Sequence, residues 1–94
     1  MAETFQLLLT AADAADLVRA RVRAARKRRG WTQAELAQHA GVSINTIARL
    51  ERTGSGQLHT LFAVLAALGH LADVQALLQA PEPKTLDELR RSQR

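Results

Sequence analysis

Apolar residues recur every three or four positions along much of the chain, the spacing that gives a helix one apolar face. From about Ala11 to Arg29 this stripe is formed by Leu17, Val18, Val22 and Ala25. From about Gln57 to Leu68 it is formed by Leu58, Leu61, Phe62, Leu65 and Leu68. A shorter stretch carries Leu71, Val74, Leu77 and Leu78. These patterns predict three helices, and Gly30 and Gly69 are placed to end the first two.

The stretch from Trp31 to Glu51 predicts two more helices joined by a tight turn. Thr32 and Glu35 have the spacing of a capping box at a helix start. Gly41 can adopt the left-handed conformation that ends a helix. Ser43 can cap the second helix, whose inner face is formed by Ile47 and Leu50. The pattern is that of a helix-turn-helix.

The second of these helices has polar groups on its remaining sides. Its outward positions are Ile44, Asn45, Ala48, Arg49 and Arg52. Amide and guanidinium groups on a short exposed helix are suited to hydrogen bonding with base edges in the major groove of DNA.

The two ends of the chain predict less. Residues 1–10 contain Thr4 to Leu9, which fits a short strand or an extended arm, and a lone strand would need a second subunit. Thr10 can cap the first helix. Residues 11–79 are predicted to form the helical domain, with Thr53 to Gly56 as a loop. Residues 80–94 form a tail after Pro81 in which a short helix from Leu86 to about Arg91 is one option.

Length and composition favour one domain made of helices. The chain has 94 residues, of which 47% are hydrophobic and only 3% aromatic, so the core is made of Leu, Ala and Val. We expect a compact bundle of about five helices. No cysteine is present, no apolar run is long enough to cross a bilayer, and no secretory signal is expected.

Positive charge is concentrated in one segment. The formal net charge is +4, and seven of the 13 basic residues lie between Arg19 and Arg29. Such a run of basic residues usually forms a solvent-exposed face of a helix, and a nuclear localisation signal is a second, weaker interpretation. Because the run leads directly into the helix-turn-helix, we favour contact with DNA phosphates, with Arg23 as a representative residue.

From Leu17 to Leu78 the chain resembles the Xre/Cro-type family of phage-repressor-like regulators. The resemblance rests on Val22-x-x-Ala25-Arg26-x-x-x-Gly30-Trp-Thr-Gln33, Glu35-Leu-Ala37, Gly41-Val-Ser43, Ile47-x-x-Leu50-Glu51-Arg52 and Leu58-x-Thr-Leu61 with Leu65-x-x-Leu68-Gly69. It implies a lambda-repressor-like bundle that binds double-stranded DNA.

The resemblance also implies roles for individual residues. Arg26 and Glu51 match the interior ion pair of the family. The base-contacting set would be Ser43, Ile44, Asn45 and Arg49. The residues that contact phosphate would include Thr32, Gln33, Thr46 and Arg52, beside Arg23. The chain departs from the family in the loop that follows the second helix of the helix-turn-helix, which in this family is the DNA-recognition helix. This loop, Thr53 to Gly56, is uncharged, where the family carries basic residues.

Each of these residues also has a simpler interpretation. Asn45 and Ile44 can be ordinary surface residues, and Arg49 can contact phosphate alone. Trp31 is expected to pack at the core or its rim and not to stack on a ligand.

No catalytic or metal-binding pattern stands out. His39, His59 and His70 lack the spacing of metal ligands, and Ser55 lacks the surroundings of a nucleophile. We therefore expect no enzyme activity, metal or cofactor.

Two functions remain. The favoured one is a sequence-specific transcriptional regulator, a repressor, that binds DNA as a homodimer. The alternative is an antitoxin of a persister-type kinase toxin, which neutralises its partner and also binds DNA. Either would be cytoplasmic, associated with the nucleoid of a bacterium or phage host, and independent of membranes.

Overall fold

The computed structural model describes residues 10–81, 90 and 91. Five helices account for most of this part: α2 (Ala11–Arg28), α3 (Gln33–Ala40), α4 (Ile44–Thr53), α5 (Leu58–Ala67) and α6 (Leu71–Ala76). No strand occurs among the described residues. The prediction of an all-α bundle of about five helices is confirmed. The predicted arm or strand at residues 1–9 and most of the predicted last helix lie outside the described part.

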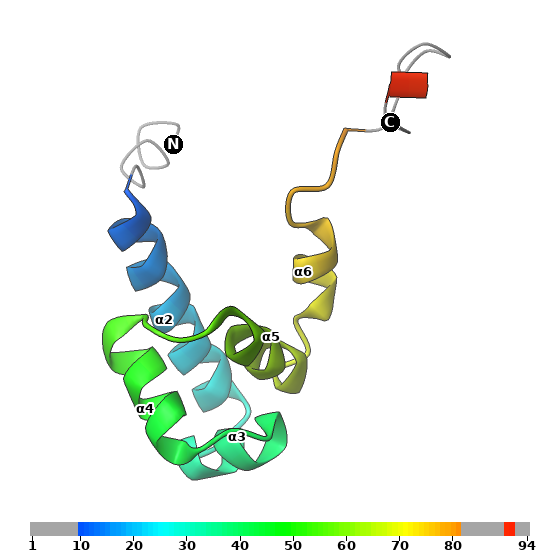
Figure 1. Ribbon diagram of the computed structural model, residues 1–94. Coiled ribbons are helices and arrows are strands. Elements are labelled where there is room, and N and C mark those ends of the chain that lie inside the picture. Colours follow the sequence, from blue (N-terminus) through cyan, green and yellow to red (C-terminus); the bar gives the residue numbers. More distant parts are fainter. Residues whose placement is uncertain (1–9, 82–89, 92–94) are drawn as a thin grey trace.

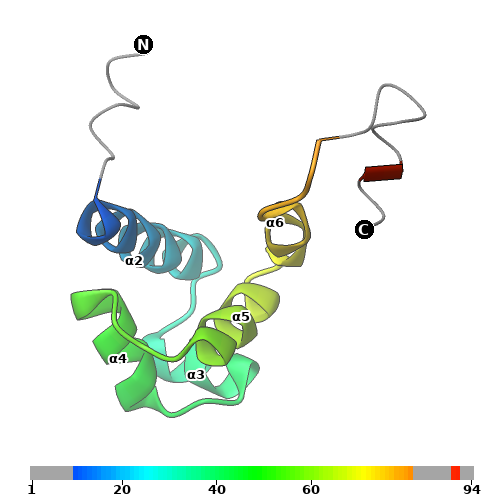
Figure 2. The ribbon, with the colours of Figure 1, turned by 45° about the horizontal axis from the view of Figure 1, so that its top comes forward.

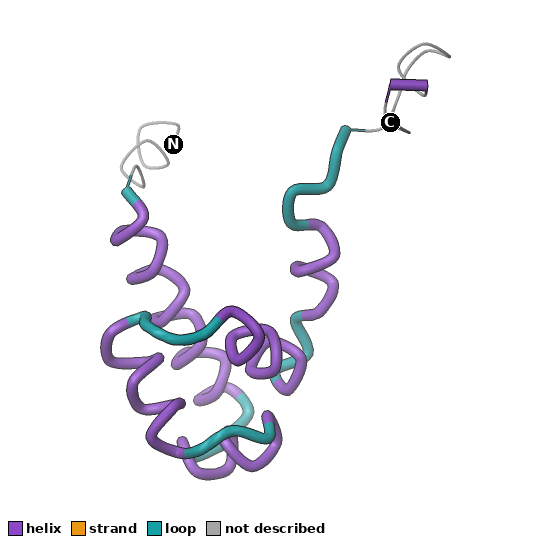
Figure 3. The backbone as a smooth tube through the Cα atoms, viewed as in Figure 1, coloured by secondary structure: helices purple, strands orange, loops and turns teal. Residues whose placement is uncertain are grey.

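Short loops join the five helices, and each helix packs against particular neighbours (Figures 1 and 3). α3 packs against both α4 and α5, α2 crosses α4, and α6 packs against α5. Two views show α3 and α4 at one end of the molecule, while α6 extends from α5 toward the other (Figures 1 and 2). The helix-turn-helix is therefore held at an outer end of the bundle by α2 and α5.

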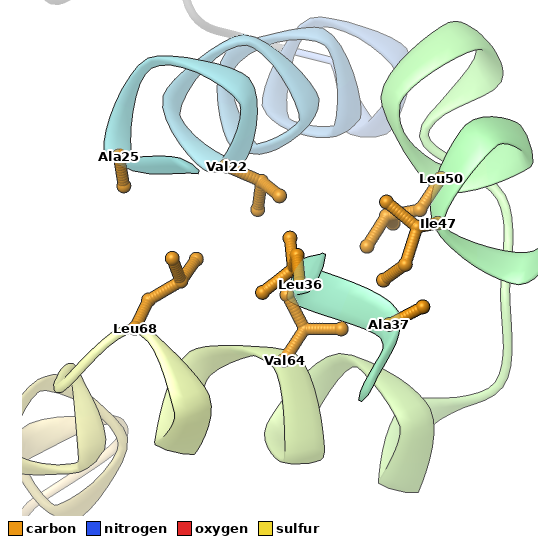
Figure 4. Close-up of a cluster of buried hydrophobic side chains, with 8 residues drawn as sticks. All are labelled: Val22, Ala25, Leu36, Ala37, Ile47, Leu50, Val64 and Leu68. Carbon is orange, nitrogen blue, oxygen red and sulfur yellow. The ribbon is translucent and has the colours of Figure 1, made fainter. Parts of the chain in front are cut away.

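The core lies where α2, α3, α4 and α5 meet (Figure 4). Its buried hydrophobic residues come from the four helices and from Leu68, which caps the end of α5: Val22, Ala25, Leu36, Ala37, Ile47, Leu50, Val64 and Leu68. Leu36, Ile47 and Val64 are completely buried. Burial of a side chain of this size stabilises a fold by about 1.5–3 kcal/mol, so these three positions tie the helix-turn-helix to α5.

The apolar stripe predicted for α5 was partly wrong. Leu58 is 66% exposed, and Val64, which lay outside the predicted stripe, is completely buried. The reason is that α5 is apolar on nearly all sides, so several stripes fit its sequence equally well. The position of α3 selects the buried face. No residue of α6 is buried. Leu71 in this helix is exposed, as are Leu77 and Leu78 directly after it.

Local capping interactions fix the helix starts. The Thr10 side chain accepts a hydrogen bond from the Asp13 amide at 3.0 Å. Thr32 and Glu35 form the reciprocal capping box, with the Glu35 amide bonded to Thr32 Oγ1 and the Thr32 amide bonded to Glu35 Oε1. Each such cap stabilises a helix by about 1 kcal/mol.

The predicted loop from Thr53 to Gly56 begins later than expected. Thr53 is the last residue of α4, and its hydroxyl bonds the Arg49 carbonyl at 2.8 Å. Gly54 ends the helix with φ of +71°, and a Cβ at this position would lie 3.0 Å from the carbonyl oxygen of Ala15 in α2. This glycine permits the close approach of α2 and α4.

Substituting Gly54 is expected to be more damaging than substituting Gly41. Both have a left-handed backbone, but a Cβ at Gly41 would meet no atom within 4 Å. Gly41→Ala should cost about 1–2 kcal/mol from backbone strain alone. Gly54→Ala adds the contact with Ala15, so its melting temperature should fall further than that of Gly41→Ala. Equal melting temperatures would contradict the importance of this contact.

Candidate nucleic-acid interface

The turn between α3 and α4 is built from backbone hydrogen bonds around one glycine. Gly41 has φ of +72°, and the amides of Gly41 and Val42 bond the carbonyls of Gln38 and Ala37. Ser43 then caps α4 by accepting a hydrogen bond from the Thr46 amide at 3.1 Å. The turn therefore fixes the direction of α4, since both helix ends are satisfied locally.

The outer face of α4 carries the polar residues expected from the sequence. Ile47 and Leu50 are buried, while Asn45, Arg49 and Arg52 are exposed. At 100° per residue, Asn45 and Arg49 each lie about 160° around the helix from Ile47. Ile44 is 49% exposed at the first turn. The side chains of Asn45, Arg49 and Arg52 have no hydrogen-bond partner among the described residues.

Two residues of the predicted set are already engaged within α4. The Ser43 hydroxyl lies 2.7 Å from the Thr46 hydroxyl and also forms the cap. Each hydroxyl retains further hydrogen-bonding capacity. Both are at the first turn of α4, where the positive end of the helix dipole attracts an anion.

The ion pair between Arg26 and Glu51 lies directly behind this surface. Arg26 donates from Nε to Glu51 Oε2 at 2.7 Å and from Nη2 to Glu51 Oε1 at 2.9 Å. Its Nη1 donates to the Trp31 carbonyl at 2.9 Å. Both residues are buried. The pair joins the last turn of α2 to the C-terminal part of α4 with two parallel hydrogen bonds.

Gln33 is part of the same cluster. Its Nε2 donates to Glu51 Oε1 at 3.2 Å, so α3 is linked to α4 through the carboxylate. The sequence placed Gln33 at the start of α3 with a phosphate role, and the second hydrogen on Nε2 remains available for that role. No buried side-chain nitrogen or oxygen in the described part lacks a partner.

The surroundings of Glu51 keep it ionised. Burial acts to raise the pKa of this carboxyl, but hydrogen bonds from Arg26 and Gln33 act in the opposite direction. The charges of Arg26 and Arg23 add to them, and the resulting pKa of Glu51 is below its ordinary value. The hydrogen bond with Glu51 likewise raises the pKa of Arg26.

The basic residues of α2 have different roles. Arg19 bonds Asp16 at 2.9 Å and reaches the Glu51 carbonyl at 3.4 Å, while Arg29 bonds the Leu68 carbonyl at 3.1 Å. These two and Arg26 connect helices, so the segment is not one phosphate-facing patch. Sequence alone gives no signal for contacts with carbonyls more than 30 residues away. The exposed remainder is Arg21, Arg23, Lys27 and Arg28.

Trp31 packs against the core and also has an aromatic partner. Its ring lies 4.1 Å from the His39 ring at an angle of 14°, and the Arg29 guanidinium lies 5.1 Å from the Trp31 ring. The sequence pointed to core packing and gave no partner for Trp31. The stack joins the α2–α3 loop to α3.

A family model described as a helix-turn-helix domain matches residues 17–80, more than half of the chain. No curated protein matches the chain. Among the described helices none has the length and apolar character needed to span a membrane. No group of three or more metal-ligating side chains occurs in the described part.

Proposed function

Since the chain belongs to the helix-turn-helix domain family, we propose that it is a sequence-specific transcriptional regulator, a repressor, that places α4 in the major groove of DNA. The observation that supports this most is the outer face of α4. It exposes Asn45, Arg49 and Arg52 while Ile47 and Leu50 anchor the helix in the core.

The chemistry of these side chains suits base recognition. The Asn45 amide can form two hydrogen bonds with adenine N6 and N7, and the Arg49 guanidinium can bond guanine O6 and N7. Ile44, which is half exposed, can contact a thymine methyl group. Ser43 adds a hydroxyl at the start of the helix. Base contacts of this kind specify sequence.

Phosphate contacts would set the position of α4 in the groove. Thr32 and Gln33 lie at the start of α3, where backbone amides and the helix dipole favour an anion. Thr46 and Arg52 border the base-contacting set on α4, and Arg23 lies on α2 beside the Glu51 end of α4. The positive formal charge of +4 favours approach to DNA.

We propose that two copies bind one operator. A single recognition helix with four base-contacting residues covers only a few base pairs, which gives little discrimination in a genome. Two copies with half-sites one helical turn apart, about 34 Å, cover a two-fold symmetric site. Occupying such a site in a promoter would block transcription without any catalytic step or cofactor. A bacterial regulator of this kind acts in the cytoplasm, where the DNA is.

Selection of bound fragments from random double-stranded DNA tests this function. We expect enrichment of a two-fold symmetric sequence with half-sites about one turn apart. Enrichment of a single half-site would show that one copy binds alone and would contradict the proposed homodimer. Recovery of random sequence at moderate salt concentration would contradict sequence-specific regulation.

Arg23→Ala is expected to weaken binding to all DNA sequences alike. Removing one phosphate contact should lower the slope of log K against log salt concentration by about one unit. Arg21→Ala is the matched control, because it removes the same charge from α2 at a position that faces α5 and α6 instead. Fluorescence anisotropy titrations at several salt concentrations measure both slopes. A loss confined to one DNA sequence would contradict the phosphate role.

The antitoxin remains a second candidate. The observation that favours it is the exposed apolar surface formed by Leu71 of α6 and by Leu77 directly after it. These residues are 52% and 62% exposed and offer a surface to a protein partner. Co-expression with the product of the neighbouring gene distinguishes the candidates. A stable complex that suppresses toxicity would support the antitoxin, and a regulator alone would give no complex.

A further inference from the structure

A groove with a volume of about 500 Å³ lies between α2, α5 and α6. Its apolar lining includes Val18 and Val22 of α2, Leu61 and Leu65 of α5, Val74 of α6 and Leu77, which directly follows α6. α2 and α6 stand apart on this side of the molecule (Figures 1 and 2). Val18 and Leu77 are 36% and 62% exposed, so the groove has apolar walls that nothing in the described part covers.

The α2 side of the groove is bordered by two arginines. Arg21 and Arg28 both line it, and neither forms a hydrogen bond or ion pair within the described part of the chain. They are seven residues apart, which is two turns or about 10.5 Å along the helix. Across the groove the one carboxylate, Asp73, is bonded to His70 at 2.9 Å. With two arginines and one carboxylate in the lining, the net charge of the groove is positive, and the positive charge lies on α2.

We propose that this groove binds an amphipathic helix of another protein, whose apolar stripe is bordered by carboxylates seven residues apart. The groove residues of α2 extend from Val18 to Arg28, about 15 Å, which is the length of a three-turn helix. Apolar anchors at i, i+3, i+4 and i+7 are the usual contacts of a helix in such a groove. Carboxylates at i and i+7 would pair with Arg21 and Arg28.

Charge argues against a second copy of this chain as the occupant. In a two-fold symmetric contact this surface meets a second copy of itself, which brings four arginines together with only two carboxylates, so like charges are in excess. Such like-charge contacts are unfavourable in an interface. An acidic partner helix is not repelled in this way, and its carboxylates can pair with the two arginines of α2.

The groove and the proposed DNA surface use different parts of the fold. No residue of α3 or α4 lines the groove, and the two helices lie at the other end of the bundle (Figure 1). Arg21 and Arg23 lie on different sides of α2, since Arg21 lines the groove and Arg23 acts on Glu51. The partner helix can therefore bind while DNA is bound.

The test uses a fluorescein-labelled synthetic helical peptide with leucines at i, i+3, i+4 and i+7 and glutamates seven residues apart beside them. Fluorescence anisotropy with the full chain should show saturable 1:1 binding. The double variant Arg21→Glu, Arg28→Glu should weaken it at least about tenfold, because two attractions become repulsions. A peptide with lysines in place of the glutamates should prefer this variant to the original chain.

The matched control is the double variant Arg23→Glu, Lys27→Glu, which changes charge equally on the other side of α2. It should keep peptide binding and lose DNA binding, whereas the groove variant should do the reverse. Leu77→Ser, at an exposed position, should weaken peptide binding and leave DNA binding intact.

Equal peptide affinity for both double variants would overturn the proposal. Sedimentation showing a dimer of the original chain that Leu77→Ser dissociates would also overturn it, because a second copy would then fill the groove. Neither result affects the proposed DNA contacts.

Discussion

Replacing Glu51 by alanine is expected to lower the free energy of unfolding by about 3–5 kcal/mol. The substitution removes the carboxylate that holds Arg26 with bonds of 2.7 and 2.9 Å and leaves a buried guanidinium without its counter-ion. It also removes the partner of Gln33, so α4 loses the hydrogen bonds of this side chain with α2 and with α3. Small domains are stable by about 5–15 kcal/mol, so this variant should be close to unfolding. Urea denaturation followed by circular dichroism measures the loss.

Two controls separate the ion pair from the loss of any carboxylate. Asp73→Ala removes an exposed acid whose side chain is 77% accessible, and it should change stability by less than about 1 kcal/mol. Arg26→Met combined with Glu51→Met replaces both charges by apolar side chains. This double variant should regain most of the stability, because no buried charge is left unpaired. A Glu51→Ala protein with unchanged stability would show that the pair does not support the fold.

The same pair predicts how stability depends on pH. The pKa of Glu51 is lowered in the folded state, so the folded state binds this proton less readily than the unfolded chain does. Its contribution is therefore present in full above the ordinary carboxyl pKa of 4.5 and is lost as the pH falls through the lowered value. The Arg26→Met, Glu51→Met variant should lose less stability than the original chain on acidification below that range.

Local features of this fold could be predicted from sequence because they depend on near neighbours. The capping box of Thr32 and Glu35, the left-handed Gly41 and the cap at Ser43 involve residues within a few positions of one another. The face that α5 buries could not be predicted, since its residues are apolar on nearly all sides and the packing of α3 decides the outcome. Val64 was missed for this reason.

In the candidate interface, too, features within one helix could be predicted from sequence, and contacts between helices could not. The outward direction of Asn45 and Arg49 follows from the buried positions of Ile47 and Leu50 on one short helix. The bonds of Arg19 and Arg29 with the carbonyls of Glu51 and Leu68 depend on how separate helices meet, and a run of basic residues does not reveal them. Only the structure shows which arginines of α2 remain available for DNA or for a protein partner.

Asn45→Ala is expected to weaken binding to the specific operator by about 1–3 kcal/mol and to relax the preference at one base pair. Asn45 is exposed and has no partner in the described part, so its removal should leave folding unchanged and act on the contact with adenine alone. Binding to unrelated DNA should stay the same, because phosphate contacts supply most of that affinity. Titrations of the selected operator and of duplexes changed at single positions measure both effects.

Gln75→Ala is the matched control for Asn45→Ala, because it removes an exposed side-chain amide on α6, away from the proposed DNA surface. It should leave both specific and non-specific affinity unchanged. If Asn45→Ala keeps full affinity while Arg49→Ala abolishes it, α4 enters the groove in a different rotation, with Arg49 central and Asn45 at the edge. If neither substitution changes specific binding, α4 is not the element that distinguishes one sequence from another. Because Asn45 and Arg49 lie on opposite sides of the line facing away from Ile47, comparing the two variants gives the rotation of α4 in the groove directly.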